Sequence, residues 1–276
     1  MPRLMRFVAI LLLAGASAVY SDEARPRLSF GFVPQQSAST LANQWTPILA
    51  YLGRETGIEL AFRTAPDIPE FERRVAAGKY DLAYMNPYHY AVFSRDPGYR
   101  AFARERGKQL RGILVVRRDS PITDVAQLDG ATLAFPAPAA FAASLLVQAN
   151  LSALGIAFEP RYVSSHDSVY RSVALGLYPA GGGIERTFAS VDPEVSQALR
   201  ILWRSKGFTP HAFAAHPRVD PALVQSLTAA MEQMTDSEEG KALLKAVEFN
   251  GIDRARDAEW DDIRQLGIHR SIGLEE

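Results

Sequence analysis

The 276-residue chain contains no cysteine, and this absence excludes several kinds of chemistry. Without thiolates there is no cysteine nucleophile, no thiolate metal site, no iron–sulfur cluster and no disulfide scaffold. The chain also lacks an excess of charge of one sign, because 30 Lys and Arg face 31 Asp and Glu. Nucleic-acid binding draws on a basic excess, so we expect no nucleic-acid partner.

The sequence signatures of the common enzyme classes are missing as well. There is no nucleophile elbow, no zinc-protease helix motif, no P-loop and no EF-hand loop, and the five histidines form no i,i+4 pair. The run Ser165-His166-Asp167-Ser168 has the residue types of a hydrolase triad, but triad members converge from separate segments. We therefore predict a protein that is not an enzyme and that binds neither a metal ion nor a cofactor.

Long apolar runs are absent except near the N-terminus. Two arginines precede an apolar stretch at 7–14, and Ala-Ser-Ala at 16–18 matches the small-x-small pattern of a signal-peptidase site. The stretch is shorter than the roughly 20 residues that span a bilayer, which disfavours the alternative of an N-terminal membrane anchor. We expect a cleaved signal peptide at 1–18 and a periplasmic protein. Cleavage of the signal peptide removes two arginines, so the mature chain is mildly acidic and would bind an anion through a local site.

Short β-rich runs alternate with helical patterns from residue 28 onward, which predicts an α/β fold. Apolar residues repeat at helical spacing near 41–52, 141–149 and 169–177, and the segment 221–266 is expected to be helical. The expected strands are 28–33, 58–64, 81–85, 112–117, 132–135, 161–164, 199–203 and 211–215.

The length exceeds what one compact core usually supports, so two lobes are expected. Extended runs at 111–120 and 208–216 are the candidate crossings between them. They predict an inserted lobe at 118–208, and a first lobe built from 22–117 plus 209–276, in a hinged layout with two crossings.

Several connections after expected strands are rich in hydrogen-bonding groups, and ligands of open α/β sheets bind at the carboxyl ends of strands. The segment 34–40 is polar and rich in helix-capping residues, and it presents amides and hydroxyls, with Gln36 and Ser39 as candidates. At 80–90 there are four tyrosines and a histidine, and strand alternation puts Tyr84 and Asn86 on one side. Plain aromatic packing is the alternative explanation for these tyrosines.

Two expected helix starts offer free backbone N–H groups. A Pro-punctuated turn at 135–144 leads into small residues, with core packing as the alternative role. Ser165 is a good N-cap, and His166 beside it could add a donor to an anion; simple helix capping is the alternative. The glycine run at 181–183 is expected to form a turn before a helix, and alone it is a weak signal.

Together these segments resemble the periplasmic phosphate/phosphite/phosphonate-binding proteins that serve ABC transporters. The likeness spans about residues 28–250. The segments that carry it are FGFVP at 30–34 with Trp45 and Pro47, YDLAYMNP at 80–87, LVVRRDSPI at 114–122, LDGATLAF at 128–135 and SHDSV at 165–169.

The resemblance implies a two-lobe periplasmic-binding-protein fold, each lobe a mixed sheet flanked by helices, with a small oxyanion bound between the lobes. It implies a membrane permease as partner, and a monomer is expected. The family's aromatic residue at the end of the third strand falls on Tyr84 or Met85, and its histidine on His166. The candidate ligand-binding residues are Gln36, Ser39, Tyr84, Asn86, Ala142, Ala143, Ser144, His166, Asp167 and His211.

Two departures from the family pattern bear on the ligand. Family members hold the oxyanion with a Ser/Thr-rich turn, which here reads Ala142-Ala143-Ser144. Members that take aminoalkylphosphonates use acidic residues for the amine, and near the corresponding crossing this chain has His211. These differences favour phosphate, phosphite or a simple phosphonate. The alternative function is a two-lobe sensory receptor that signals to a membrane histidine kinase.

Overall fold

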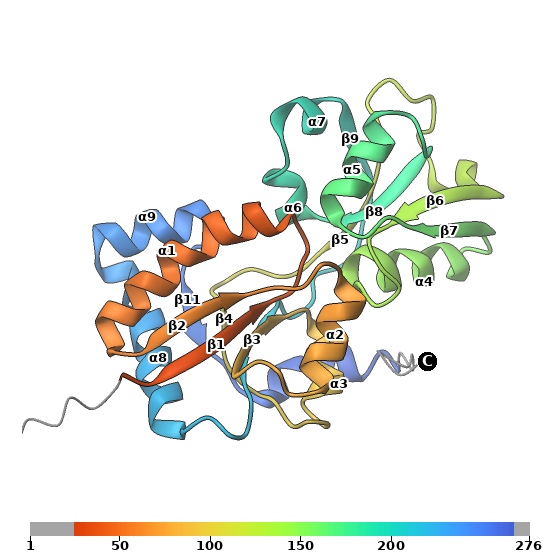
Figure 1. Ribbon diagram of the computed structural model, residues 1–276. Helices are drawn as coiled ribbons and strands as arrows, with labels where there is room; N and C mark the ends of the chain where they lie inside the picture. Colours follow the sequence, from red (N-terminus) through yellow and green to blue (C-terminus); the bar gives the residue numbers. More distant parts are fainter. Residues whose placement is uncertain (1–24, 268–276) are drawn as a thin grey trace, which may run out of the picture.

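The computed structural model describes residues 25–267 and divides them between two α/β lobes (Figure 1). Each lobe holds one mixed β-sheet with helices packed against it, so the fold predicted from the sequence is confirmed. The expected signal peptide, 1–18, lies outside the described residues. Between residues 25 and 267, no helix has the length and apolar character needed to span a bilayer.

The first lobe is built on a six-stranded sheet. Its strands are β1 (Arg27–Phe32), β2 (Glu59–Arg63), β3 (Leu82–Met85), β4 (Arg100–Glu105), β10 (Ala212–Ala215) and β11 (Ile252–Arg254). They lie in the order β11-β4-β10-β3-β1-β2. Strand β1 is parallel to β2 and β3, whereas β10 returns from the second lobe and runs antiparallel to β3 and β4.

Helices cover both faces of this sheet (Figure 1). They are α1 (Ala38–Thr56), α2 (Ile68–Ala76), α3 (Pro87–Phe93), α8 (Pro221–Gln233), α9 (Glu238–Ala246) and α10 (Asp261–Arg264), with single turns η3 (Met234–Asp236) and η4 (Asp257–Trp260). Trp45 of α1 packs against Phe32, Tyr84 and Phe213 of the strands. This aromatic core supports the end of the sheet that faces the second lobe.

The second lobe is built on a five-stranded sheet in which β5 is a central strand. The strands are β5 (Gly112–Arg117), β6 (Ala131–Phe135), β7 (Phe158–Tyr162), β8 (Ala180–Ile184) and β9 (Leu199–Arg204), in the order β7-β6-β8-β5-β9. The helical segments are η1 (Val125–Leu128), the π-helical turn η2 (Phe141–Leu145), α4 (Leu146–Ala153), α5 (His166–Ala174), α6 (Glu185–Ala189) and α7 (Pro193–Gln197).

The pairing of β5 moves the division between the sheets relative to the sequence-based boundary. Residues 112–117 were expected in the first lobe, but β5 pairs with β8 and β9 of the second sheet. It is almost fully buried, as a strand with neighbours on both sides should be. The crossings are therefore the shorter segments 106–111 and 205–211. They touch where Leu110 and Phe208 exchange backbone hydrogen bonds of 2.8 and 3.0 Å.

Three strands differ from the sequence-based expectation. The glycine run 181–183 lies within β8 and is not a turn, β4 was not expected, and β11 interrupts the segment 221–266. Strand β8 needs its glycines because other parts of the lobe come very close to it. A Cβ at Gly182 would stand against the Ala143 carbonyl oxygen, and a Cβ at Gly183 would enter the ring of Tyr170.

Candidate ligand-binding site

A narrow cavity lies between the two lobes, beside the hinge. Its volume is about 10 Å³, which is room for roughly one water molecule. The first lobe and the crossings contribute Val33, Gln35, Ile68, Asn86, Leu110 and His211, and the second lobe contributes Ala140, Phe141, Ala142, Ala143, His166 and Ile184. A polyatomic ligand therefore enters only when the lobes separate.

Asn86 is held at the cavity by the start of α3. Its Oδ1 accepts a 2.8 Å hydrogen bond from the backbone N–H of His89, as an N-cap side chain does. Its Nδ2 lies 3.2 Å from the Ala139 carbonyl oxygen of the second lobe and 3.1 Å from His89 Nε2, which also contacts Glu72 at 2.8 Å. The side chain is thus fixed by its own helix and already bridges the two lobes.

His166 is the first residue of α5, which Ser165 caps. Its backbone N–H donates a 3.0 Å hydrogen bond to the Gln35 carbonyl oxygen across the lobes, and its Nδ1 lies 3.0 Å from Thr187 Oγ1. Burial and, to a lesser extent, the Arg186 guanidinium lower the pKa of His166 to about 3. At neutral pH this imidazole is therefore uncharged.

His211 faces the cavity from the second crossing, and its ring stacks on Tyr84 with centroids 5.1 Å apart. Gln35 connects it to Arg186: Gln35 Oε1 accepts a 2.8 Å hydrogen bond from the guanidinium, so Gln35 Nε2 is left to donate to His211 Nε2 at 2.9 Å. An imidazole nitrogen that accepts carries no proton. Burial first, and then the positive charge of Arg186, lower the pKa of His211 well below its usual value.

Backbone N–H groups reach the cavity at the start of the helix formed by η2 and α4. The first amide to bond within this helix is that of Ser144, which donates to the Ala140 carbonyl oxygen at 2.7 Å. The preceding N–H groups, those of Phe141, Ala142 and Ala143, therefore have no intrahelical acceptor, as at any helix start. All three residues line the cavity. The close approach of this turn to Gly182 of β8 sets their position.

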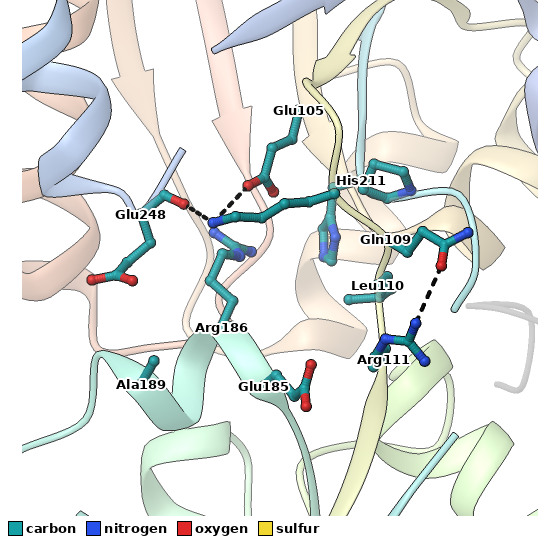
Figure 2. Close-up of a pocket in the computed structure, with 11 residues that line it drawn as sticks. Glu105, Gln109, Leu110, Arg111, Glu185, Arg186, Ala189, His211 and Glu248 are labelled. Atoms are coloured by element: carbon teal, nitrogen blue, oxygen red, sulfur yellow. Dashed lines mark hydrogen bonds and ion pairs between the residues drawn. The ribbon is translucent and has the colours of Figure 1, made fainter. Parts of the chain in front are cut away.

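A second, larger cavity adjoins the first and shares Leu110 and His211 with it. Its volume is about 210 Å³. The walls are the first crossing, α6 and the end of β4, as Figure 2 shows. Charged side chains of both signs line it, in contrast to the first cavity: Glu105, Lys108, Arg111, Glu185, Arg186 and Glu248.

The structure brings five of the ten predicted site residues to the first cavity: Asn86, Ala142, Ala143, His166 and His211. The other five line neither cavity. Tyr84 is buried beneath His211, Ser144 is fully buried, and Gln36 donates to Ser190 across the lobes at 3.1 Å. Ser39 is exposed beside Ser37, and Asp167 is half-buried at the start of α5. The geometry gives these five no direct place at a ligand.

The residues that the sequence analysis missed are Gln35 and Arg186. Gln35 is the neighbour of the predicted Gln36, and only the register of the 34–40 segment decides which of the two faces the cavity. Arg186 follows the glycine run, and the expectation of a turn there gave no reason to place it at a site. In residues 25–267, no three histidine or acidic side chains are grouped so that they could hold a metal ion.

Comparison with known proteins agrees with this geometry. Residues 30–260 match the family model described as ABC transporter, phosphonate, periplasmic substrate-binding protein. The phosphate-import protein PhnD of Mycolicibacterium smegmatis is 22% identical over 93% of this chain and 92% of its own length. The phosphonates-binding periplasmic protein of Escherichia coli is 27% identical over 41% of this chain and 34% of its own length.

Two solved structures share the fold with a TM-score of 0.81 each. One is a binding protein component of an ABC phosphonate transporter from Pseudomonas aeruginosa, 17% identical, with 88% of this chain and 86% of that chain covered. The other is PhnD1 of Prochlorococcus marinus in complex with methylphosphonate, 14% identical, with 88% and 97% covered. Because the family model covers most of the chain, the protein belongs to the family of periplasmic substrate-binding proteins of phosphonate ABC transporters.

Proposed function

We propose that this protein captures a small phosphorus oxyanion (phosphate, phosphite or a phosphonate) in the inter-lobe cavity and delivers it to an ABC permease. The observation that carries the proposal is the chemistry of the cavity wall, which offers hydrogen-bond donors from both lobes and no carboxylate. The donors are the imidazole of His166, the backbone N–H groups of residues 141–143, and the amide of Asn86, which would exchange its bond to the Ala139 carbonyl oxygen for one to the ligand. The charged oxygens of an oxyanion accept hydrogen bonds, so they match such a wall.

The neutral state of the two histidines suits this role. In an uncharged imidazole one ring nitrogen carries a proton and donates, and the other carries a lone pair and accepts. The hydrogen-bond partner of one nitrogen therefore decides whether the other nitrogen donates or accepts. Hydrogen bonds to an ionised acceptor are stronger than neutral ones. A helix start adds the favourable end of the helix dipole. Arg186 supplies positive potential from the neighbouring cavity without lining the oxyanion cavity itself.

The proposed release to a permease rests on the family and on the two-lobe geometry. A ligand bound by residues of both lobes favours their closed arrangement, which a membrane partner could distinguish from the open one. We infer that the protein acts by binding alone, as a periplasmic monomer exported with the signal peptide 1–18. The names of the relatives in M. smegmatis and P. marinus support phosphate and methylphosphonate as ligands to test first.

A thermal-shift panel tests this proposal. The mature chain is heated with phosphate, phosphite, methylphosphonate, aminoethylphosphonate and sulfate in turn. At about 100 times its dissociation constant, a true ligand stabilises the folded chain by about 2.7 kcal/mol, which gives a visible rise in Tm. We expect a rise with at least one phosphorus oxyanion and a smaller one with sulfate. A panel in which no phosphorus compound raises Tm would overturn the proposal.

A further inference from the structure

The cavity beside the oxyanion site has its own cation, Arg186. The guanidinium lies over the rings of Tyr84 and Phe249, 5.8 and 5.7 Å from their centroids, and donates one hydrogen bond to Gln35. Within residues 25–267 it has no carboxylate at ion-pair distance. A half-buried guanidinium with most of its five N–H donors unused is poised for an anion.

Two of the three acidic side chains of this cavity pair with other cations, whereas the exposed Glu248 carboxylate has no ion pair within residues 25–267. Glu185 pairs with Arg204 at 2.5 Å, and the buried Glu105 pairs with Lys108 at 3.2 Å. Lys108 also donates to the Glu248 carbonyl oxygen. Burial raises the pKa of Glu105. An ammonium group beside Arg186 would therefore face the positive charges of Arg186 and Lys108, with the exposed Glu248 as the one unpaired acidic side chain of the lining.

We propose that Arg186 binds a carboxylate carried on the organic substituent of the ligand, so that the chain takes phosphonocarboxylates with a short carbon linker. This inference rests on the proposed function, because the oxyanion cavity must hold the phosphonate. The two cavities meet at His211 and Leu110, so a substituent on a bound phosphonate leads from one into the other. A planar guanidinium matches a carboxylate through two parallel hydrogen bonds.

The size of the second cavity agrees with a substituent of a few atoms. About 210 Å³ is far more than the space beside Asn86 and His166, so a bare phosphate or phosphite would leave most of the combined site unused. The cavity wall is charged, so a plain alkyl chain would remove the Arg186 guanidinium from water without giving it a charged partner. A terminal carboxylate uses the volume and pairs the free guanidinium.

Titration calorimetry on the mature chain tests the proposal with matched ligands. The ligands are 3-phosphonopropionate and propylphosphonate, which share a chain length and differ in the carboxylate, together with methylphosphonate and aminoethylphosphonate. The wild type should bind 3-phosphonopropionate about ten- to a hundredfold more tightly than propylphosphonate, the range expected for a charge-assisted contact. In Arg186→Gln this preference should fall to about threefold or less.

Two further variants separate the geometry of the contact from its charge. Arg186→Lys keeps the charge without the planar fork and should retain only part of the preference. Arg118→Gln removes one positive charge from an exposed site of the same lobe, where the guanidinium donates to the Gln197 carbonyl oxygen, and should keep the full preference. Melting curves of all variants check that each is folded.

The outcomes distinguish this inference from the proposed function. If methylphosphonate binds but the carboxylate brings no gain, or if Arg186→Gln keeps the gain, the assignment of Arg186 is wrong and the oxyanion site stands. Tighter binding of aminoethylphosphonate than of 3-phosphonopropionate would also overturn it. If no phosphorus compound binds, the proposed function itself fails.

Discussion

At the scale of single residues, the charge state of the cavity histidines is what the structure adds to the sequence. Both His166 and His211 were candidates from their positions in the chain, but their burial and their distance from Arg186 could not be known from sequence. Because burial and a nearby guanidinium both disfavour a second positive charge, both rings are neutral. An oxyanion in this cavity would therefore contact neutral hydrogen-bonding groups, with the Arg186 guanidinium as a positive charge nearby.

His166 is the residue whose removal should reduce oxyanion affinity most clearly. His166→Ala deletes one donor to a charged acceptor, and such hydrogen bonds are worth about 1.5–3 kcal/mol. We expect methylphosphonate to bind about ten- to a hundredfold more weakly, measured by calorimetry. His216→Gln, on an unrelated histidine of the first lobe that lines neither cavity, is the matched control. Wild-type affinity in a natively melting His166→Ala would show that this imidazole does not contact the ligand.

The low pKa of His166 also predicts how folding stability depends on pH. The folded ring titrates at about 3 and the unfolded ring near 6.5, so between these values the unfolded chain holds a proton that the folded chain does not. Stability should therefore fall as the pH drops from about 6.5 towards 3, by up to about 1.4 kcal/mol per pH unit from this ring. In His166→Gln the fall should be shallower. Urea unfolding at several pH values measures it, and equal slopes in both chains would contradict the account.

At the scale of elements, the helix starts were predictable and part of the sheet was not. Ser165 caps α5 as expected, and Ser37, within the polar segment 34–40, caps α1, because an N-cap is a contact within a few residues of the chain. Strand β8 was missed because its glycines are required by close contacts with residues distant in sequence, such as Ala143 and Tyr170. Local propensity indicates a turn at three glycines, and only the packed lobe shows why they lie in a strand.

The same distinction holds within the site. Asn86 and His166 line the cavity and could be singled out from the sequence because each stands at a local signal, a strand that ends in Asn-Pro or a capped helix start. Gln35 and Arg186 were missed because their roles arise only when two segments about 150 residues apart come together across the lobes. Tyr84 was placed at the right strand end but on the wrong surface, since it packs into the aromatic core below His211.

A substitution at Gly182 tests whether β8 positions the backbone N–H groups of residues 141–143. In Gly182→Ala the added methyl group would meet the Ala143 carbonyl oxygen and the Phe135 ring, so the start of the η2–α4 helix must move. We expect a loss of about 1–3 kcal/mol in stability, as for overpacking elsewhere, and weaker methylphosphonate binding. Gly155→Asn is the control, because a Cβ there meets no neighbouring atom and Asn tolerates the left-handed conformation. Denaturant unfolding and calorimetry should find the control close to wild type. Unchanged binding in Gly182→Ala would mean that the helix start is not held by this contact.

At the scale of the whole molecule, the two lobes are joined by two short crossings and pack against each other, with residues 139–143 of the second lobe buried against the first. The contacts across the cavity include Gln36 to Ser190 and Asn86 to the Ala139 carbonyl oxygen. Such contacts are broken when the lobes separate at the crossings near Leu110 and Phe208. A ligand bound to both lobes adds further contacts that only the closed arrangement provides.

Small-angle scattering measures this change. Saturating methylphosphonate should lower the radius of gyration of the mature chain, because an ensemble that includes open molecules shifts to the closed form. The His166→Ala chain at the same ligand concentration should compact less. An unchanged scattering profile, at a concentration where calorimetry shows saturation, would mean that binding does not depend on lobe closure.

The central claim is that the narrow cavity between the lobes is the oxyanion site, and a crystal structure grown with methylphosphonate tests it most directly. The account predicts phosphonate density in hydrogen-bond contact with Asn86, with His166 Nε2 and with backbone N–H groups of residues 141–143. It also predicts the methyl group on the side of His211 and Leu110, facing the larger cavity. Phosphonate density elsewhere on the chain, or in this cavity with its oxygens turned away from His166 and the helix start, would contradict the account.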